Sequence, residues 1–120
     1  MADISLARFQ RPLLAVLALV SLGYLYLGTR PQAPAMLAGV SDVTIHGGAY
    51  LLLGGLAGAV AVALSLPRPG LAGFLYAVGH GALLELLQLF TPPRRAEVKD
   101  LLVDAIAALL GTALLRWRRR

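Results

Sequence analysis

The chain contains no cysteine and carries little charge. Of its 120 residues, only 14% are charged and 58% are hydrophobic. The missing thiols exclude disulfides, iron–sulfur clusters, thiolate zinc sites and a cysteine nucleophile. A soluble domain of this size needs more surface charge than these residues supply. Because the apolar residues run almost unbroken between the charges, the sequence predicts a multi-pass membrane protein of one small domain, residues 1–120.

Common catalytic and phosphate-binding motifs are also missing from the sequence. It has no glycine-rich phosphate loop, Walker sequence or serine nucleophile elbow. The net charge of +5 does not indicate nucleic-acid binding, because four of the eleven basic residues directly follow the last apolar segment, at Arg116 and 118–120. A basic cluster in that place is typical of a cytoplasmic anchor facing anionic lipid. We therefore expect membrane lipids, and not nucleic acid, as partners.

Four apolar segments are long enough to cross, or nearly cross, the hydrocarbon core of a bilayer. They lie at residues 12–28, 45–66, 71–90 and 101–115. Arg8 and Arg11 before the first segment also fit a signal peptide, but no clean cleavage site follows it, so we expect a helix there. Tyr24 and Tyr26 are expected at the membrane interface. The predicted fold class is therefore all-α, a four-transmembrane-helix bundle.

The basic residues predict the orientation of these four helices. With four spans, both termini lie on the same side of the membrane, together with the turn between the second and third segments. That side holds seven basic residues, and the other side holds four, which are Arg30, Arg94, Arg95 and Lys99. The positive-inside rule then predicts that both termini are cytoplasmic.

Polar residues gather toward the outer half of the predicted bundle. They are Asp42, His46, Tyr50, Glu85, Gln88, Arg94, Arg95, Asp100 and Asp104. Because such residues are costly in hydrocarbon, they indicate a functional site. Helical periodicity places Asp42, His46 and Tyr50 on one stripe, and it places Asp100 and Asp104 on another.

The chemistry of this polar group is open to several interpretations. The carboxylates and arginines could simply neutralise one another and close the end of the bundle. His46 with Asp42, Glu85 and Asp100 could supply metal ligands, but no fixed ligand motif is present and the arginines oppose a cation, so we expect no metal or other cofactor. A histidine beside carboxylates could also serve acid–base chemistry on a lipid-linked substrate. That signal is weak, so a non-enzymatic protein is favoured and no catalytic residue is assigned.

Small residues and one central histidine are expected to serve packing. Gly54 and Gly58 lie on one helix face, and Ala107, Ala108 and Gly111 continue the stripe of Asp100 and Asp104. Such residues let neighbouring helices approach closely. Gly81, four residues before Glu85, leaves room beside that carboxylate. His80 is expected to be neutral and hydrogen-bonded, on a different face from Glu85.

The polar residues, taken in order, resemble the VanZ-like family of small bacterial membrane proteins. The matching stretch runs from Asp42 to about Gly111, through SDVTIHGGAYLLLGG, ELLQLF-TPPRRAEVKD and DLLVDAIAALLG. The residues that match the family pattern are Asp42, His46, Tyr50, Glu85, Gln88, Pro93, Arg94 or Arg95, Asp100 and Gly111. Two positions depart from it. Val43 stands where the family commonly has lysine, and Asp104 stands where it has asparagine.

The resemblance implies a multi-helix protein of the bacterial inner membrane. Members of the family are generally assigned to antibiotic resistance, in particular to glycopeptides, or to cell-envelope roles. The resemblance therefore implies that the polar group binds a cell-envelope ligand, such as a lipid-linked cell-wall precursor or an antibiotic resembling one. Arg94 and Arg95 would contact its phosphate or carboxylate. The alternative is an accessory structural subunit of a larger membrane complex, with other membrane proteins as partners.

Overall fold

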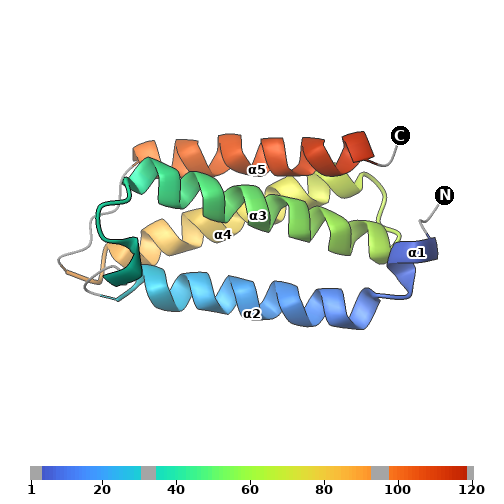
Figure 1. Ribbon diagram of the computed structural model, residues 1–120, viewed down its shortest axis with the longest axis horizontal. Coiled ribbons are helices and arrows are strands. Elements are labelled where there is room, and N and C mark those ends of the chain that lie inside the picture. The colour runs from blue at the N-terminus through green and yellow to red at the C-terminus, as the bar shows by residue number, and fades with distance from the viewer. Residues whose placement is uncertain (1–3, 31–34, 93–97, 119–120) are drawn as a thin grey trace.

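Every long element of the chain is a helix. The computed structural model describes residues 4–30, 35–92 and 98–118, and its regular elements in these ranges are all helical (Figure 1). They are α1 (Ile4–Ala7), α2 (Gln10–Gly28), a 3₁₀ turn (Ala35–Leu37), α3 (Asp42–Ala63), α4 (Pro69–Gln88) and α5 (Val98–Arg118). The four predicted helices are confirmed, with each boundary shifted by three residues or fewer.

The four long helices form an elongated bundle of 47 × 24 × 24 Å. Helix α3 is central and packs against α2, α4 and α5. Helices α2 and α5 lie on opposite sides of it (Figure 1). Since successive helices alternate in direction, the C-terminal ends of α2 and α4 meet the N-terminal ends of α3 and α5. We call this end of the bundle, which contains Gly28, Asp42, Gln88 and Asp100, the site end.

Local signals explain where α3 begins and ends. The Ser41 hydroxyl accepts a hydrogen bond from the Thr44 backbone N–H at 3.2 Å, so the helix begins before the apolar run. At the other end, Ser65 has φ 57° and the Leu66 N–H donates to the Ala61 carbonyl. This is a Schellman motif, which stops the helix at Ala63 although apolar residues continue.

Close helix contacts depend on glycine, as expected. A Cβ atom on Gly54 would lie 2.6 Å from the Ala108 carbonyl oxygen of α5. A Cβ on Gly111 would collide with the Leu51 carbonyl oxygen, and one on Gly73 would lie 2.6 Å from the Gly58 backbone nitrogen. Each of these positions excludes a larger residue unless the helices separate. Gly54 and Gly58 therefore serve contacts inside the bundle.

The surface of the bundle is that of a membrane protein. Helices α2, α3 and α4 are each long and apolar enough to cross a membrane. Large apolar side chains point outward along them, including Leu19, Leu52 and Leu75 at 71%, 56% and 57% exposure. Soluble proteins rarely expose so continuous an apolar surface. The protein therefore has at least three helices suited to lipid.

The sequence predicted a fourth apolar span, and the structure corrects this prediction. Helix α5 has 21 residues and is long enough to cross a membrane, but its composition is less apolar than that of α2, α3 and α4 and does not mark it as a span. Every 18-residue stretch of it contains at least three charged residues, drawn from Lys99, Asp100, Asp104, Arg116 and Arg118. By composition alone, the described part of the chain supplies three membrane spans and not four.

Candidate functional site

Three helices bring an imidazole and three carboxyl groups together at the site end. His46 comes from α3, Glu85 from α4, and Asp100 and Asp104 from α5. The Nδ1 atom of His46 lies 2.8 Å from Oδ1 of Asp104, and its Nε2 atom lies 3.8 Å from Oδ2 of Asp100. One donor atom from each of His46, Glu85 and Asp104 falls within 4.8 Å of the others. We call these four residues the His46 cluster.

The helix geometry explains this meeting. His46 is in the second turn of α3, and Glu85 is in the last turn of α4, so both face the site end. Asp100 and Asp104 are four residues apart and share a face of α5. A Cβ on Gly81 would lie 2.8 Å from Oδ2 of Asp104. The space left by Gly81, expected beside Glu85, therefore accommodates the carboxylate of Asp104.

The carboxyl groups of the cluster are buried. Asp104 is 0% exposed, Asp100 is 7% exposed and Glu85 is 8% exposed. The second oxygen of Asp104, Oδ2, has no hydrogen-bond partner within the described residues. Burying a carboxylate costs free energy unless it is paired, hydrogen-bonded or bound to a metal. This arrangement therefore differs from the solvated salt bridges that usually close the end of a helical bundle.

A second hydrogen-bonded chain lies deeper in the bundle. The Tyr50 hydroxyl and His80 Nδ1 are 2.8 Å apart, and His80 Nε2 lies 2.8 Å from the Ser21 carbonyl oxygen. Because a carbonyl oxygen can only accept, Nε2 is the donor, and in the neutral ring Nδ1 accepts from the Tyr50 hydroxyl. This chain links α2, α3 and α4. The expected hydrogen-bonded, packed role of His80 is confirmed.

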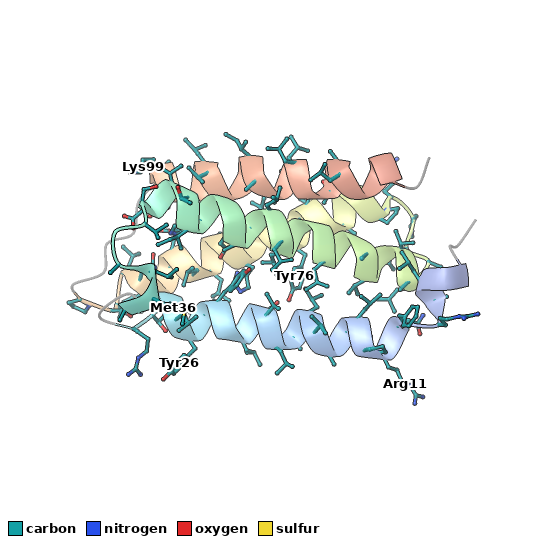
Figure 2. The ribbon with its side chains drawn as sticks, in the orientation of Figure 1. Arg11, Tyr26, Met36, Tyr76 and Lys99 are labelled. Atoms are coloured by element: carbon teal, nitrogen blue, oxygen red, sulfur yellow. The ribbon has the colours of Figure 1, made fainter. Side chains whose placement is uncertain are left out.

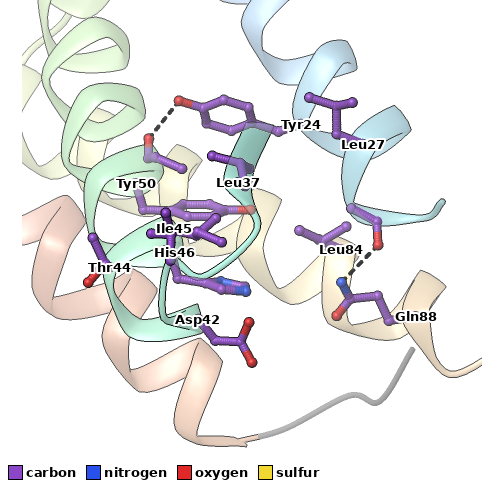
Figure 3. A pocket seen from close by; sticks show the side chains of 13 residues that line it. Tyr24, Leu27, Leu37, Asp42, Thr44, Ile45, His46, Tyr50, Leu84 and Gln88 are labelled. Carbon is purple, nitrogen blue, oxygen red and sulfur yellow. Dashed lines mark hydrogen bonds between the residues drawn. The ribbon is translucent and has the colours of Figure 1, made fainter. Parts of the chain in front are cut away.

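A cavity of about 410 Å³ opens at the site end between α2, the 3₁₀ turn, α3 and α4. Its walls are largely apolar, and polar groups interrupt them (Figure 3). The Tyr24 hydroxyl donates to the Ala49 carbonyl and Gln88 Nε2 donates to the Gly28 carbonyl, each at 2.9 Å. The lining residues are Tyr24, Leu27, Gly28, Leu37, Val40, Asp42, Thr44, Ile45, His46, Ala49, Tyr50, Leu84 and Gln88.

The predicted site residues divide between the cavity and the cluster. Asp42, His46, Tyr50 and Gln88 line the cavity, whereas Glu85, Asp100 and Asp104 belong to the cluster, and His46 belongs to both. The sequence suggested that Asp42 could lie beside His46 and Glu85. Asp42 is instead exposed, and Asp104 lies in that place. Arg94 and Arg95 lie outside the described residues.

Residues of α2 are the part of the site that the sequence did not indicate. Tyr24 was expected at the membrane interface, but it is only partly exposed and bonds to α3 within the cavity wall. Ser21 is buried, and its hydroxyl lies 2.7 Å from that of Tyr76. Ser21 and Tyr24 lie one turn apart on the helix face that also buries Leu17, and this spacing was the available signal.

Comparison with known proteins adds no identification. We found no family model, curated protein or solved structure that matches this chain. The function is therefore inferred from the cavity, the His46 cluster and the apolar surface of the bundle, and membership of the VanZ-like family is a proposal.

Proposed function

We propose that the chain is a VanZ-like protein of the bacterial cytoplasmic membrane that binds an amphipathic cell-envelope ligand in the cavity at its site end. The observation that carries this proposal is the cavity itself. It combines apolar walls with the polar groups of Asp42, His46 and Gln88 in a bundle that otherwise faces lipid. Ligand pockets typically have this composition, and about 410 Å³ is within their usual size range.

Helix α5 is the fourth membrane span in this proposal. Its two acids, Asp100 and Asp104, are buried against α3 and α4, so they do not face lipid. Its outward side consists of Leu102, Ile106, Leu109, Leu110 and Leu114, which are 55–61% exposed. Its 21 residues extend about 31 Å, enough to cross the hydrocarbon core. The composition of α5 therefore overstates the polarity that it presents to a bilayer.

The distribution of basic residues supports cytoplasmic termini. Arg8, Arg11 and Arg68 lie at the end opposite the site end, whereas Arg30 and Lys99 lie at the site end; Arg11 and Lys99 mark the two ends in Figure 2. Arg116 and Arg118, in the last turn of α5, add to the first group. By the positive-inside rule, the site end faces outward, where cell-wall precursors and antibiotics are found.

The ligand in this proposal is a lipid-linked cell-wall precursor or an antibiotic resembling one. An acyl or prenyl chain suits the apolar walls, and a sugar or peptide head group suits the hydrogen-bonding groups of His46, Gln88 and Thr44. Arg94 and Arg95 follow α4 by a few residues and supply the phosphate or carboxylate contact. Four residues that carry the family resemblance, Asp42, His46, Tyr50 and Gln88, line the cavity and so support the assignment.

The decisive experiment fills the cavity without changing its polar groups. Ala49→Leu replaces a methyl group of the wall by an isobutyl group, and Ala113→Leu, at an exposed position of α5, is the matched control. In nanodiscs, we expect Ala49→Leu to weaken binding of a lipid-linked disaccharide pyrophosphate at least about tenfold, a loss of about 1.4 kcal/mol, with Ala113→Leu unchanged. Arg94→Gln combined with Arg95→Gln should weaken it too and lower glycopeptide tolerance. Equal binding by all variants, at equal protein level, would rule out this cavity as the binding site, and no binding by the wild type would rule out this ligand.

An accessory subunit is the second candidate, favoured by the surface of α2. That helix fully buries only Leu17 and Ser21 and leaves large apolar side chains such as Leu19 and Leu22, 71% and 64% exposed, available to other membrane proteins. Purification in mild detergent followed by mass spectrometry separates the two proposals. Stoichiometric membrane partners favour the subunit, and a lone monomer or homodimer favours the ligand-binding protein.

A further inference from the structure

The His46 cluster has the composition and spacing of a metal site, contrary to the expectation from the sequence. We propose that His46, Glu85 and Asp104 bind one divalent transition-metal ion, with Asp100 orienting the imidazole. The metal ligands considered from the sequence included Asp42, which is exposed, whereas the folded chain places the buried Asp104 beside His46 and Glu85. This inference concerns a site beside the cavity and does not depend on the identity of the ligand proposed above.

The donor spacing fits a single ion. Ligand atoms lie about 2.1 Å from such an ion, so adjacent donors are about 3 Å apart and opposite donors are about 4.2 Å apart. The donors of His46, Glu85 and Asp104 fall within 4.8 Å of one another. His46 Nδ1 and Asp104 Oδ1 are separated by 2.8 Å, close to the spacing of adjacent donors. Side-chain rotations that bring the three donors closer together would then complete the site.

Burial and charge give the ion a reason to bind. His46 contacts two buried carboxyl groups, those of Asp100 and Asp104. Asp104 is fully buried, and its Oδ2 atom, which has no hydrogen-bond partner in the described part of the chain, faces α4 one turn before Glu85. A divalent ion would supply two charges and a partner for this oxygen.

The surroundings hold the donors in place. The His46 ring stacks on Tyr50 with centroids 6.2 Å apart and planes 10° from parallel. The Nε2 atom of His46 lies 3.8 Å from Oδ2 of Asp100. When Nδ1 binds the ion, Nε2 carries the ring proton and faces this carboxylate. A carboxylate behind a metal-binding histidine fixes the tautomer and strengthens the ligand. The three donors also come from helices rather than loops, which gives the site a rigid frame.

The donor set narrows the choice of metal. One imidazole nitrogen and carboxylate oxygens, without sulfur, suit Zn²⁺, Mn²⁺, Fe²⁺ or Co²⁺ better than a soft ion such as Cu⁺. His46 also lines the cavity, so an ion can reach the cluster through it. A bound ion would leave positions open toward the cavity, because the protein supplies three donors.

The test uses the full-length chain in detergent, stripped with EDTA and titrated with Co²⁺ alone. We expect one Co²⁺ per chain, seen as a visible absorption band that Zn²⁺ abolishes. Glu85→Gln and Asp104→Asn keep the shape of each side chain and should weaken the affinity by at least about tenfold. Asp42→Asn, a carboxylate one turn from His46 but outside the cluster, is the matched control and should bind as the wild type does. Acidification should weaken binding, because the imidazole must lose its proton.

The melting temperature distinguishes a metal site from a purely structural cluster, because only a metal site is stabilised by Co²⁺. Co²⁺ should raise the melting temperature of the wild type and of Asp42→Asn but not that of Asp104→Asn. If a cluster variant fails to fold, the wild-type titration still decides the question. Wild-type protein that binds no Co²⁺ or Zn²⁺ saturably overturns the proposal, as does equal affinity in Asp104→Asn. A loss confined to Asp42→Asn would overturn the ligand set. If the wild type binds metal but not the lipid-linked ligand, the metal site is supported and only the proposal of the cavity ligand is disproved.

Discussion

At the residue scale, the buried polar atoms of Tyr50, His80 and Ser21 satisfy one another. Each group is almost completely buried, with Tyr50 at 1% and His80 at 8% exposure. Inside a membrane, water cannot replace a missing hydrogen bond, so the chain must supply every partner. The linkage of α2, α3 and α4 through these side chains therefore fixes the rotation of three helices relative to one another.

Tyr50→Phe tests this linkage. The change removes the hydroxyl that donates to His80 Nδ1 but preserves the ring that stacks on His46. We expect the free energy of unfolding to fall by about 1–2 kcal/mol, because a buried nitrogen loses its donor. Tyr26→Phe is the control, since Tyr26 is 60% exposed. Unfolding in detergent, followed by circular dichroism, measures both, and equal stability of the two variants would contradict the linkage.

At the element scale, the helices were predictable because their signals are local. Apolar runs, prolines and the Pro67-Arg68-Pro69-Gly70 turn located all four helices from the sequence. The boundaries shifted where caps competed with hydrophobicity. The Ser41 cap extended α3 backward, and the Schellman motif at Ser65 shortened it. Such caps depend on backbone geometry that a hydrophobic pattern does not specify.

Gly54→Ala tests the close crossing of α3 and α5. The added methyl group would lie 2.6 Å from the Ala108 carbonyl oxygen, so the helices must separate. We expect a loss of about 1–3 kcal/mol in unfolding free energy, the usual result of overpacking. Gly79→Ala on α4 is the matched control, because nothing lies within 4 Å of its Cβ position. That variant should be unchanged or more stable by up to about 1 kcal/mol, since alanine favours helix. The reverse order of stability would refute the tight crossing.

At the scale of the whole molecule, the four long helices have 19 to 22 residues and extend about 29–33 Å, close to the thickness of the hydrocarbon core of a bilayer, about 30 Å. The ends of the helices therefore reach the headgroup region on both sides. His46 and Asp100 lie within two turns of helix N-termini, so the His46 cluster lies near that boundary and not at the bilayer centre. The cost of its charges is correspondingly lower than at mid-membrane.

The absence of cysteine makes the topology directly measurable. Met36, 87% exposed between α2 and α3, and Leu66, in the α3–α4 turn, each accept a single cysteine, and a third can be appended after Arg120. In intact cells, an impermeant maleimide should label Met36→Cys. The Leu66→Cys and appended cysteines should react only after permeabilisation. In intact cells, labelling of the appended cysteine but not of Leu66→Cys would show that α5 does not cross the membrane. Labelling of both of these cysteines, with Met36→Cys protected, would show that the orientation is inverted.

The candidate site was predictable as a set of residue types but not as a geometry. Periodicity predicted that Asp42, His46 and Tyr50 share one stripe of a helix, a relation that lies within one element, and all three residues line the cavity. The partnership of His46 with Asp104 joins residues 58 positions apart, and it depends on how α3 and α5 pack. Ser21 and Tyr24 were missed as site residues for the same reason, since their partners lie on α3 and α4.

The sequence by itself determined the all-helical class, the location of the helices and their preference for lipid, because these follow from local hydrophobicity and turn residues. The tertiary structure decided which charges are buried together. It enclosed Asp104 fully and left Asp42 exposed, although both are aspartates near the N-terminus of an apolar helix. The difference comes from the contacts between helices, where glycines such as Gly81 leave the space that a buried carboxylate occupies.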